Sequence, residues 1–195
     1  MTVKYSQPQS LSNRNTAFVK IHQRQVIDVA LAVLDEQGLA ELQMRAVAGR
    51  LNVQASALYW HVRNKAELLS LMSAHFYDAA RTAVPEGLSW RDWLLTFGKS
   101  FRMALLGHHD SAQLCAIARP VSEDTEAAAD LLSKPLILAG LSRHVALSYQ
   151  SSVISLVLGW CIYEQSEALH DYLARMIGFD ESFTTGLTAM VAGFP

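Results

Sequence analysis

Apolar residues recur at helical spacing along most of this chain. From about Lys20 they return every three or four positions until Gly38, which predicts a first helix that ends at this glycine. The same spacing predicts three further helices in the first half of the chain: a short one from Leu42 to Leu51, one from Gln54 to Trp60, and a longer one from Lys65 to Arg81.

The second half carries the same pattern between clear breaks. Pro85-Glu86-Gly87 interrupts it, and the following Ser89-Trp90-Arg91-Asp92 resembles a capping box that opens a helix reaching Leu106. Residues 107–110 end that helix, and Arg119-Pro120 marks another break. Ser122 is suited to cap a helix over residues 123–139, and further helices are expected over residues 142–173 and 181–191. Because no run of alternating β-branched residues appears, we expect an all-α protein.

This pattern divides the chain near residue 66. We expect a mobile extension over residues 1–19, one domain over residues 20–65 and a second over residues 66–195. Hydrophobic residues make up 51% of the sequence and charged residues 17%, which favours a sizeable core over disorder. Cys115 and Cys161 form no CxxC pair and no secretory signal is present, so we expect reduced thiols in a cytoplasmic protein. The longest apolar stretch, Val153–Ile162, is shorter than the roughly 20 residues of a membrane span.

The formal net charge of −2 hides an uneven distribution. Residues 1–65 carry eight Lys and Arg against four Asp and Glu, a net charge of +4, which leaves −6 on the remainder. A basic first domain beside an acidic second one suits a polyanionic partner at one end only.

The segment from Leu42 to Val62 has the layout of a helix-turn-helix. Its first helix has small apolar residues, and Asn52 stands at the turn, where a left-handed backbone is required and Asn tolerates it. Val53 and Leu58 are spaced to anchor the second helix from below. In this motif the second helix enters the major groove of DNA.

The outward positions carry side chains that suit DNA recognition. Gln54 can pair with a base edge, Ser56 with a base or a phosphate, and the Ala57 methyl with thymine. Arg45, Lys65 and the Tyr59 hydroxyl are placed to hold phosphates, which position the protein without specifying sequence. The alternative is an ordinary helical hairpin with an exposed Tyr and Trp. We expect the DNA-binding surface to comprise Arg45, Gln54, Ser56, Ala57, Tyr59, Trp60, His61 and Lys65.

Several motifs resemble those of the tetracycline-repressor (TetR) family. The segment Leu58-Tyr59-Trp60-His61-Val62-Arg63-Asn64-Lys65, followed by Leu68-Leu69, looks like the family's signature. Residues 89–92, 99–102, 104–106, 119–120 and 161–164 are similar to the sensing core of the tetracycline repressors. The resemblance covers about residues 20–170. It implies a three-helix DNA-binding head, a helical ligand-binding and dimerisation core, and a linking helix that shifts when ligand binds.

The resemblance also implies a ligand site. Phe101, Arg119, Pro120 and Glu164 keep the residue types of the family's drug site, whereas three positions differ. Cys115 replaces the histidine that binds the drug-borne magnesium, Phe97 replaces an amide, and Arg81 replaces a second histidine. Because a thiol is a poor ligand for magnesium, we expect an apolar or aromatic effector and no metal or cofactor. The expected ligand-binding residues are Arg81, Trp93, Phe97, Phe101, Cys115, Arg119, Pro120, Trp160 and Glu164.

Some features leave alternatives open. Each of these aromatic residues considered singly fits a core position equally well, and Arg119 and Glu164 could contact ligand or form a structural ion pair. His108-His109-Asp110 is expected to be a solvated loop and not a metal site. Neither Ser56 nor Ser111 has an identifiable neighbouring base, so we find no catalytic constellation and expect no enzyme.

One helix carries a stripe of small residues, Ser148, Ser152, Ser155 and Gly159, that suits close helix–helix packing. The resemblance favours a homodimer contact there. Together these features predict a ligand-responsive regulator, most simply a repressor that binds a palindromic operator as a homodimer. An activator, or a helical small-molecule-binding protein or enzyme that has lost its DNA-binding role, are the alternatives.

Overall fold

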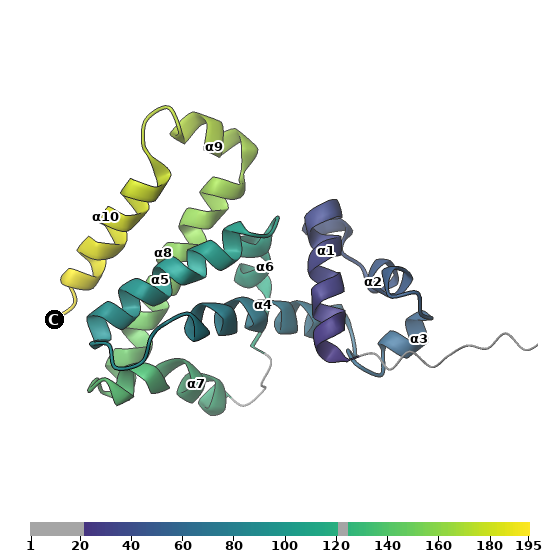
Figure 1. The fold of residues 1–195 in the computed structure, drawn as a ribbon, viewed down its shortest axis with the longest axis horizontal. Helices are drawn as coiled ribbons and strands as arrows, with labels where there is room; N and C mark the ends of the chain where they lie inside the picture. The colour runs from purple at the N-terminus through teal and green to yellow at the C-terminus, as the bar shows by residue number, and fades with distance from the viewer. Residues whose placement is uncertain (1–21, 121–124) are drawn as a thin grey trace, which may run out of the picture.

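The computed structural model describes residues 22–120 and 125–195, and within them the fold is entirely helical (Figure 1). The expectations for residues 1–19 and for a cap at Ser122 lie outside the described residues. The helices are α1 (Gln23–Glu41), α2 (Met44–Arg50), α3 (Ala55–Leu58), α4 (Lys65–Thr82), α5 (Trp90–Leu106), α6 (Ser111–Ile117), α7 (Thr125–Leu138), α8 (Arg143–Gln165), α9 (Glu167–Leu173) and α10 (Phe179–Ala192).

Helices α1, α2 and α3 form a small head at one end of the molecule, and α4 leads from it into the core (Figure 1). The helical turns of α1 stop at Gly38, whose backbone is left-handed with φ +76°. A Cβ there would also lie 3.2 Å from Asp110 Oδ2, so glycine meets both a conformational and a spatial requirement. The predicted stop at this residue is confirmed.

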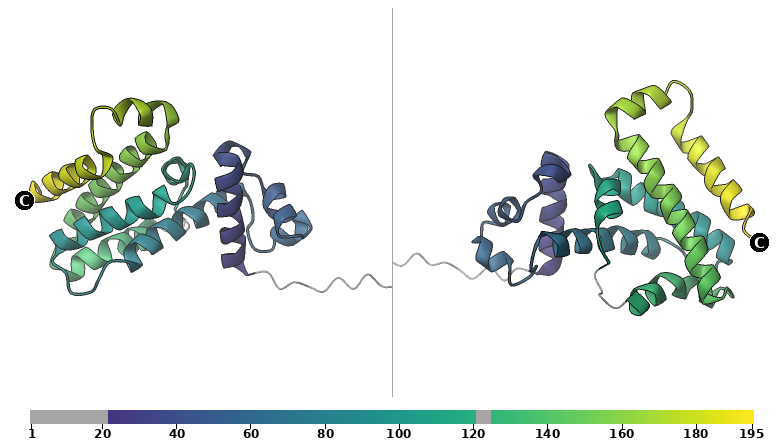
Figure 2. Two further views of the ribbon diagram at one scale, coloured as in Figure 1. Left: turned by 45° about the horizontal axis from the view of Figure 1, so that its top comes forward. Right: turned by 180° about the vertical axis from the view of Figure 1, so that it is seen from behind.

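The core is built around α5 and α8, which pack against each other and against α4, α6, α7 and α10. Figure 2 shows α10 running beside α8 on the side of the core away from the head. The close approach of α5 to α8 and α10 depends on Gly98, where a Cβ would lie 2.9 Å from Leu187 Cδ2 and 3.1 Å from Val153 Cγ1. Ser89 begins α5 as expected, because its hydroxyl accepts a hydrogen bond from the Asp92 N–H.

The head meets the core at the loop between α5 and α6 as well as through α4. The carboxylate of Asp35 on α1 lies 2.9 Å from His108 Nδ1 and accepts a hydrogen bond of 2.9 Å from the His109 N–H. In the opposite direction, Asp110 accepts a 2.9 Å hydrogen bond from the Leu39 N–H. The loop predicted to be solvated is therefore half-buried at His108 and Asp110 and bonded to the head.

Gln165 fixes the same loop from the other side. Its Nε2 donates to the carbonyls of Leu105 and His108 at 3.0 and 2.8 Å, and its Oε1 accepts from the Ala112 N–H. The end of α8 is thereby tied to the joint between α5 and α6.

Three helix predictions differ from the structure. Helix α6 was not predicted. The helix expected over residues 142–173 is divided at Ser166, whose ψ of 110° is extended, so that α8 and α9 are separate. The last helix begins at Phe179, two residues before Glu181. The other helices agree with prediction within a few residues.

Helix α8 is long and apolar enough to cross a membrane by length and composition alone. The helix is longer than the apolar run Val153–Ile162 within it. Four of its apolar residues, Ala146, Val153, Val157 and Cys161, are buried in the core, where α8 is in contact with α5, α6, α7, α9 and α10.

Candidate DNA-binding surface and ligand cavity

The left-handed backbone of Asn52, in the turn between α2 and α3, determines the angle at which these helices pack. Asn52 has φ 55°, and the N–H groups of Asn52 and Val53 donate to the carbonyls of Gly49 and Ala48, each at 3.0 Å. Leu58 is fully buried and holds the short α3 against the head. The turn geometry expected from the sequence is confirmed, and it leaves α3 at the far end of the head (Figure 1).

The residues expected to meet DNA lie on α2, α3 and the start of α4. Five of them are exposed: Arg45, Gln54, Ser56, Tyr59 and Trp60. Trp60 is 88% exposed, more than any other large hydrophobic residue described. Ala57, His61 and Lys65 are half-buried. Together with the exposed Tyr59, Trp60 forms an uncovered apolar patch, which is a feature typical of contact surfaces.

Two neighbouring arginines already have partners. Arg50 forms a bidentate ion pair with Glu36, which ties α2 to α1. Glu67 accepts hydrogen bonds from the Arg63 N–H and side chain while Asn64 caps α4, and this holds the first turn of the linking helix. Arg45 and Lys65 have no ion pair within the described residues, so their charges are available to phosphates.

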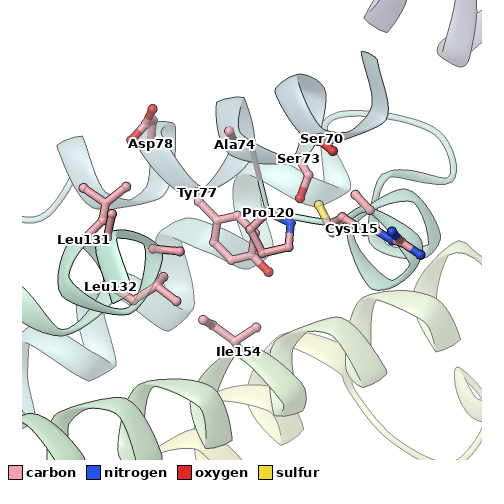
Figure 3. Close-up of a pocket in the computed structure, with 14 residues that line it drawn as sticks. Ser70, Ser73, Ala74, Tyr77, Asp78, Cys115, Pro120, Leu131, Leu132 and Ile154 are labelled. Atoms are coloured by element: carbon pink, nitrogen blue, oxygen red, sulfur yellow. The ribbon is translucent and has the colours of Figure 1, made fainter. Parts of the chain in front are cut away.

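A cavity of about 550 Å³ lies in the core between α4, α6, α7 and α8 (Figure 3). Its volume falls in the range of roughly 300–1,000 Å³ that is usual for small-molecule sites. Figure 3 shows the Tyr77 ring projecting from α4 into the space above Ile154 of α8. The other lining residues are mostly small or apolar: Ser70, Ser73, Ala74, Asp78, Cys115, Ala118, Arg119, Pro120, Ala127, Ala128, Leu131 and Leu132.

Two ionisable groups of the cavity lining, Cys115 and Tyr77, are held neutral by burial. Burial raises the pKa of the Cys115 thiol to about 11, although a hydrogen bond with Ser73 partly opposes the shift. Burial also raises the pKa of Tyr77 far above its usual range. At neutral pH the cavity therefore offers an uncharged thiol and an uncharged phenol in a mostly apolar wall, to which Asp78 and Arg119 also contribute.

A second chamber of about 40 Å³ adjoins the first and shares Tyr77, Asp78, Leu131 and Leu132 with it. Its remaining walls are Arg81, Phe97 and Gln150. Of the nine residues expected to bind ligand, Cys115, Arg119 and Pro120 line the larger cavity, and Arg81 and Phe97 line the smaller one. Gln150 was not expected, because it lies among the polar residues Ser148, Ser151 and Ser152 and nothing in the sequence sets it apart from them.

Four expected ligand-binding residues line neither chamber. Trp93 stacks on Phe97, and Phe101 stacks on Tyr77 with ring centroids 4.6 Å apart, so both support the wall from behind. Trp160 lies near Phe183 of α10, with centroids 6.1 Å apart. Six residues separate it from Ile154, and at 100° per residue this places it well around α8 from the cavity face.

Glu164 belongs to an ion-pair cluster instead. Arg102 of α5 donates to both of its oxygens, at 2.8 and 2.6 Å, and lies 2.7 Å from Asp180 of α10. The side chains of Arg102 and Glu164 are only 10% and 8% exposed. The partner of Glu164 is thus Arg102, and the alternative of an Arg119–Glu164 pair is not found. Within residues 22–120 and 125–195, no cluster of three or more His, Cys, Asp or Glu residues has metal-binding geometry.

The small-residue stripe of α8 lies largely on the surface. Ser148 and Ser155 are exposed, and a Cβ built on Gly159 meets nothing within 4 Å. The hydroxyls of Ser148 and Ser152 donate to backbone carbonyls one turn earlier, at 2.9 Å in both cases, so neither hydroxyl loses its hydrogen bond when covered. A Cβ on Gly186 of α10 is likewise free of contact. This surface suits close packing against another helix pair.

Comparison with known families identifies both parts of the chain. Residues 26–72 match the family model described as bacterial regulatory proteins of the tetR family. Residues 84–176 match the model of the tetracyclin repressor-like C-terminal domain. The boundary between the two matches falls close to the end of α4.

Individual relatives agree with these matches. A class A tetracycline repressor protein from Escherichia coli is 36% identical over 75% of this chain and 68% of its own length. An HTH-type transcriptional regulator from Saccharopolyspora erythraea is 31% identical over 70% of this chain, which spans only 58% of that protein.

Two solved structures are similar over most of the fold. TetR of class A in complex with 5a,6-anhydrotetracycline and magnesium has a TM-score of 0.67 and 33% identity, covering 87% of this chain and 95% of the other. BioQ with its natural double-stranded DNA operator has a TM-score of 0.61 and 32% identity, covering 87% and 99%.

Proposed function

This chain belongs to the TetR family of bacterial regulatory proteins, and we propose that it is a homodimeric transcriptional repressor that an apolar or aromatic small molecule releases from its operator. The head binds DNA, the core holds the effector, and α8 with α10 forms the dimer contact. The protein acts in the cytoplasm and catalyses no reaction.

The observation that carries this proposal is the exposed surface of α3 and its flanks. The turn at Asn52 presents Gln54, Ser56 and Ala57 for the major groove. Two such helices in a dimer read half-sites about one helical turn apart on a palindrome. A mobility-shift assay with the DNA upstream of the protein's own gene tests this directly. Binding that weakens steeply between low and physiological salt is expected, because bound phosphates release counterions. Absence of binding to any genomic fragment at low salt would contradict the proposal.

Substitutions in the head should distinguish residues that contact bases from residues that contact phosphates. We expect Gln54→Ala to cost about 1–3 kcal/mol on the preferred operator and to change which bases are preferred. Tyr59→Ala and Lys65→Ala should weaken binding to all sequences alike, and Lys65→Ala should also lower the salt dependence. Selection of binding sites from a random DNA library measures both effects. An unchanged preference in Gln54→Ala would show that this side chain does not face the bases.

The effector proposal rests on the chemistry of the larger cavity. Its wall is chiefly aliphatic, and the groups of Cys115 and Tyr77 are neutral at physiological pH. A ligand that fills this space gains free energy mainly by burying apolar surface, at roughly 25 cal/mol per Å². Release from DNA requires only that the effector bind more tightly to a conformation in which the two heads no longer fit the operator. A hundredfold preference for that conformation corresponds to about 2.7 kcal/mol.

Tetracycline itself should bind weakly, and magnesium should not improve its affinity. The Cys115 thiol would have to lose a proton whose pKa is about 11 before it could ligate a metal, and magnesium prefers oxygen. Calorimetric titration of the dimer with tetracycline, with and without magnesium, measures this. Tight binding that depends on magnesium would make the protein a tetracycline sensor and overturn the effector proposal, with DNA binding unaffected.

A further inference from the structure

We propose that Gln150 selects the effector, and that the effector is a neutral, largely apolar molecule with a hydroxyl or N–H group that donates to Gln150 Oε1. This inference rests on the proposed function, because it names the chemistry of the same ligand site. Nothing in the family matches assigns a role to this glutamine.

The first observation is an unsatisfied amide. Gln150 is only 3% exposed, and its Oε1 is buried without a hydrogen-bond partner in the structure. Most buried polar atoms in folded proteins have a partner, because an unpaired acceptor loses its hydrogen bonds to water without compensation. A glutamine in this state is therefore poised to accept a hydrogen bond from a molecule that enters the site.

The second observation is where this amide lies. Gln150 lines the smaller chamber, which shares Tyr77, Leu131 and Leu132 with the larger cavity. The smaller chamber has room for a polar group of one or two heavy atoms, and the larger one for an apolar ring system. A ligand that lies along both chambers puts its body against the leucines and its polar end at Gln150.

The third observation concerns charge. The two ionisable side chains of the smaller chamber besides Tyr77 are Asp78 and Arg81, which form an ion pair at 3.2 Å and so largely cancel each other. The pKa of Tyr77 is raised, so its phenol is neutral. Phe97 and Leu132 provide no hydrogen bonds. An uncharged donor therefore suits this chamber better than a carboxylate or an ammonium group, which would be buried without a counter-ion.

A matched pair of probes tests the proposal. 4-Hydroxybiphenyl has a donor at one end, and 4-fluorobiphenyl has a similar shape with no donor. Calorimetric titration of the dimer without DNA should show the hydroxyl compound binding about tenfold more tightly or better, because a site built around a hydrogen bond rejects the analogue that lacks it. In Gln150→Met, which keeps the length of the side chain, this preference should disappear.

Two controls complete the experiment. Ser133→Ala removes a buried hydroxyl of α7 that lines neither chamber and donates to the Ala129 carbonyl at 2.8 Å, so it should leave the preference intact. Without ligand, Gln150→Met should raise the melting temperature by about 2–4 °C, since an unsatisfied amide is replaced by a thioether.

Three results would overturn the assignment. These are equal affinity of the native protein for both probes, a preference that persists in Gln150→Met, and failure of 4-hydroxybiphenyl to bind. If the preference persists in Gln150→Met, the hydrogen-bond partner of Gln150 Oε1 is an ordered water molecule and not the ligand. Operator binding is measured separately on the same samples, so a failure here is distinct from a failure of the proposed function.

Discussion

Replacing Arg102 with Met should lower the free energy of unfolding by about 3–5 kcal/mol, because Glu164 then remains buried without its counter-charge. Both side chains are nearly covered, and the two hydrogen bonds between them are short. Arg102 also lies over the Phe183 ring, 4.9 Å from its centroid, so α10 loses a contact as well. Denaturation with urea, followed by circular dichroism, measures the change.

The double variant Arg102→Met with Glu164→Met should recover most of this loss, since no isolated charge remains in the core. Arg143→Met provides the matched control. Arg143 also pairs with two carboxylates, Glu126 and Asp130, but all three side chains are substantially exposed, so little change is expected. Equal stability of Arg102→Met and the native protein would show that the cluster contributes nothing to folding.

Replacing Gly159 with Arg should convert the dimer to a monomer and reduce operator affinity by two to four orders of magnitude. The charged side chain would enter the surface where the small-residue stripe packs against its partner, while the monomer accommodates it because a Cβ there meets nothing within 4 Å. Without a dimer the second head no longer benefits from a high effective concentration, which is typically worth about 10²–10⁴ in affinity.

Analytical ultracentrifugation reports the oligomeric state, and fluorescence anisotropy with operator DNA reports the affinity. Gln113→Arg adds the same charge at an exposed position of α6 and should remain dimeric. Helical circular dichroism should not fall in either variant, because arginine is a better helix former than glycine and about as good a helix former as glutamine. A Gly159→Arg protein that sediments as a dimer would place the dimer contact elsewhere.

The elements that the sequence predicted well are those with local causes. Asn52 predicts a left-handed turn, Gly38 predicts a helix end and Ser89 predicts a helix start, because each acts on its immediate neighbours. Helix α6 has seven residues, and unlike the equally short α2 it belongs to no helix-turn-helix layout that would indicate it. At Ser166 the division between α8 and α9 involves neither glycine nor proline, so the sequence carries no conspicuous break there.

The ligand site was harder to predict because it is assembled from distant segments. Residue types alone do not distinguish an aromatic that lines a cavity from one that supports it, as Phe97 and Phe101 show. The true partner of Glu164 lies 62 residues away on α5. Nothing in the sequence indicates a binding role for Gln150, and only the burial of its Oε1 without a hydrogen-bond partner suggests one.

The double attachment of the head restricts how it can turn. One attachment is the continuous helix α4, and the other is the set of bonds from Asp35 and Leu39 to the α5–α6 loop. A body held at two separate points rotates freely only about the line that joins them. Any other rotation stretches the Asp35–His108 contact or the Leu39–Asp110 hydrogen bond. The two heads of a dimer are thus limited to one axis each, and a small displacement of α6 beside the cavity becomes a change in the distance between the two α3 helices.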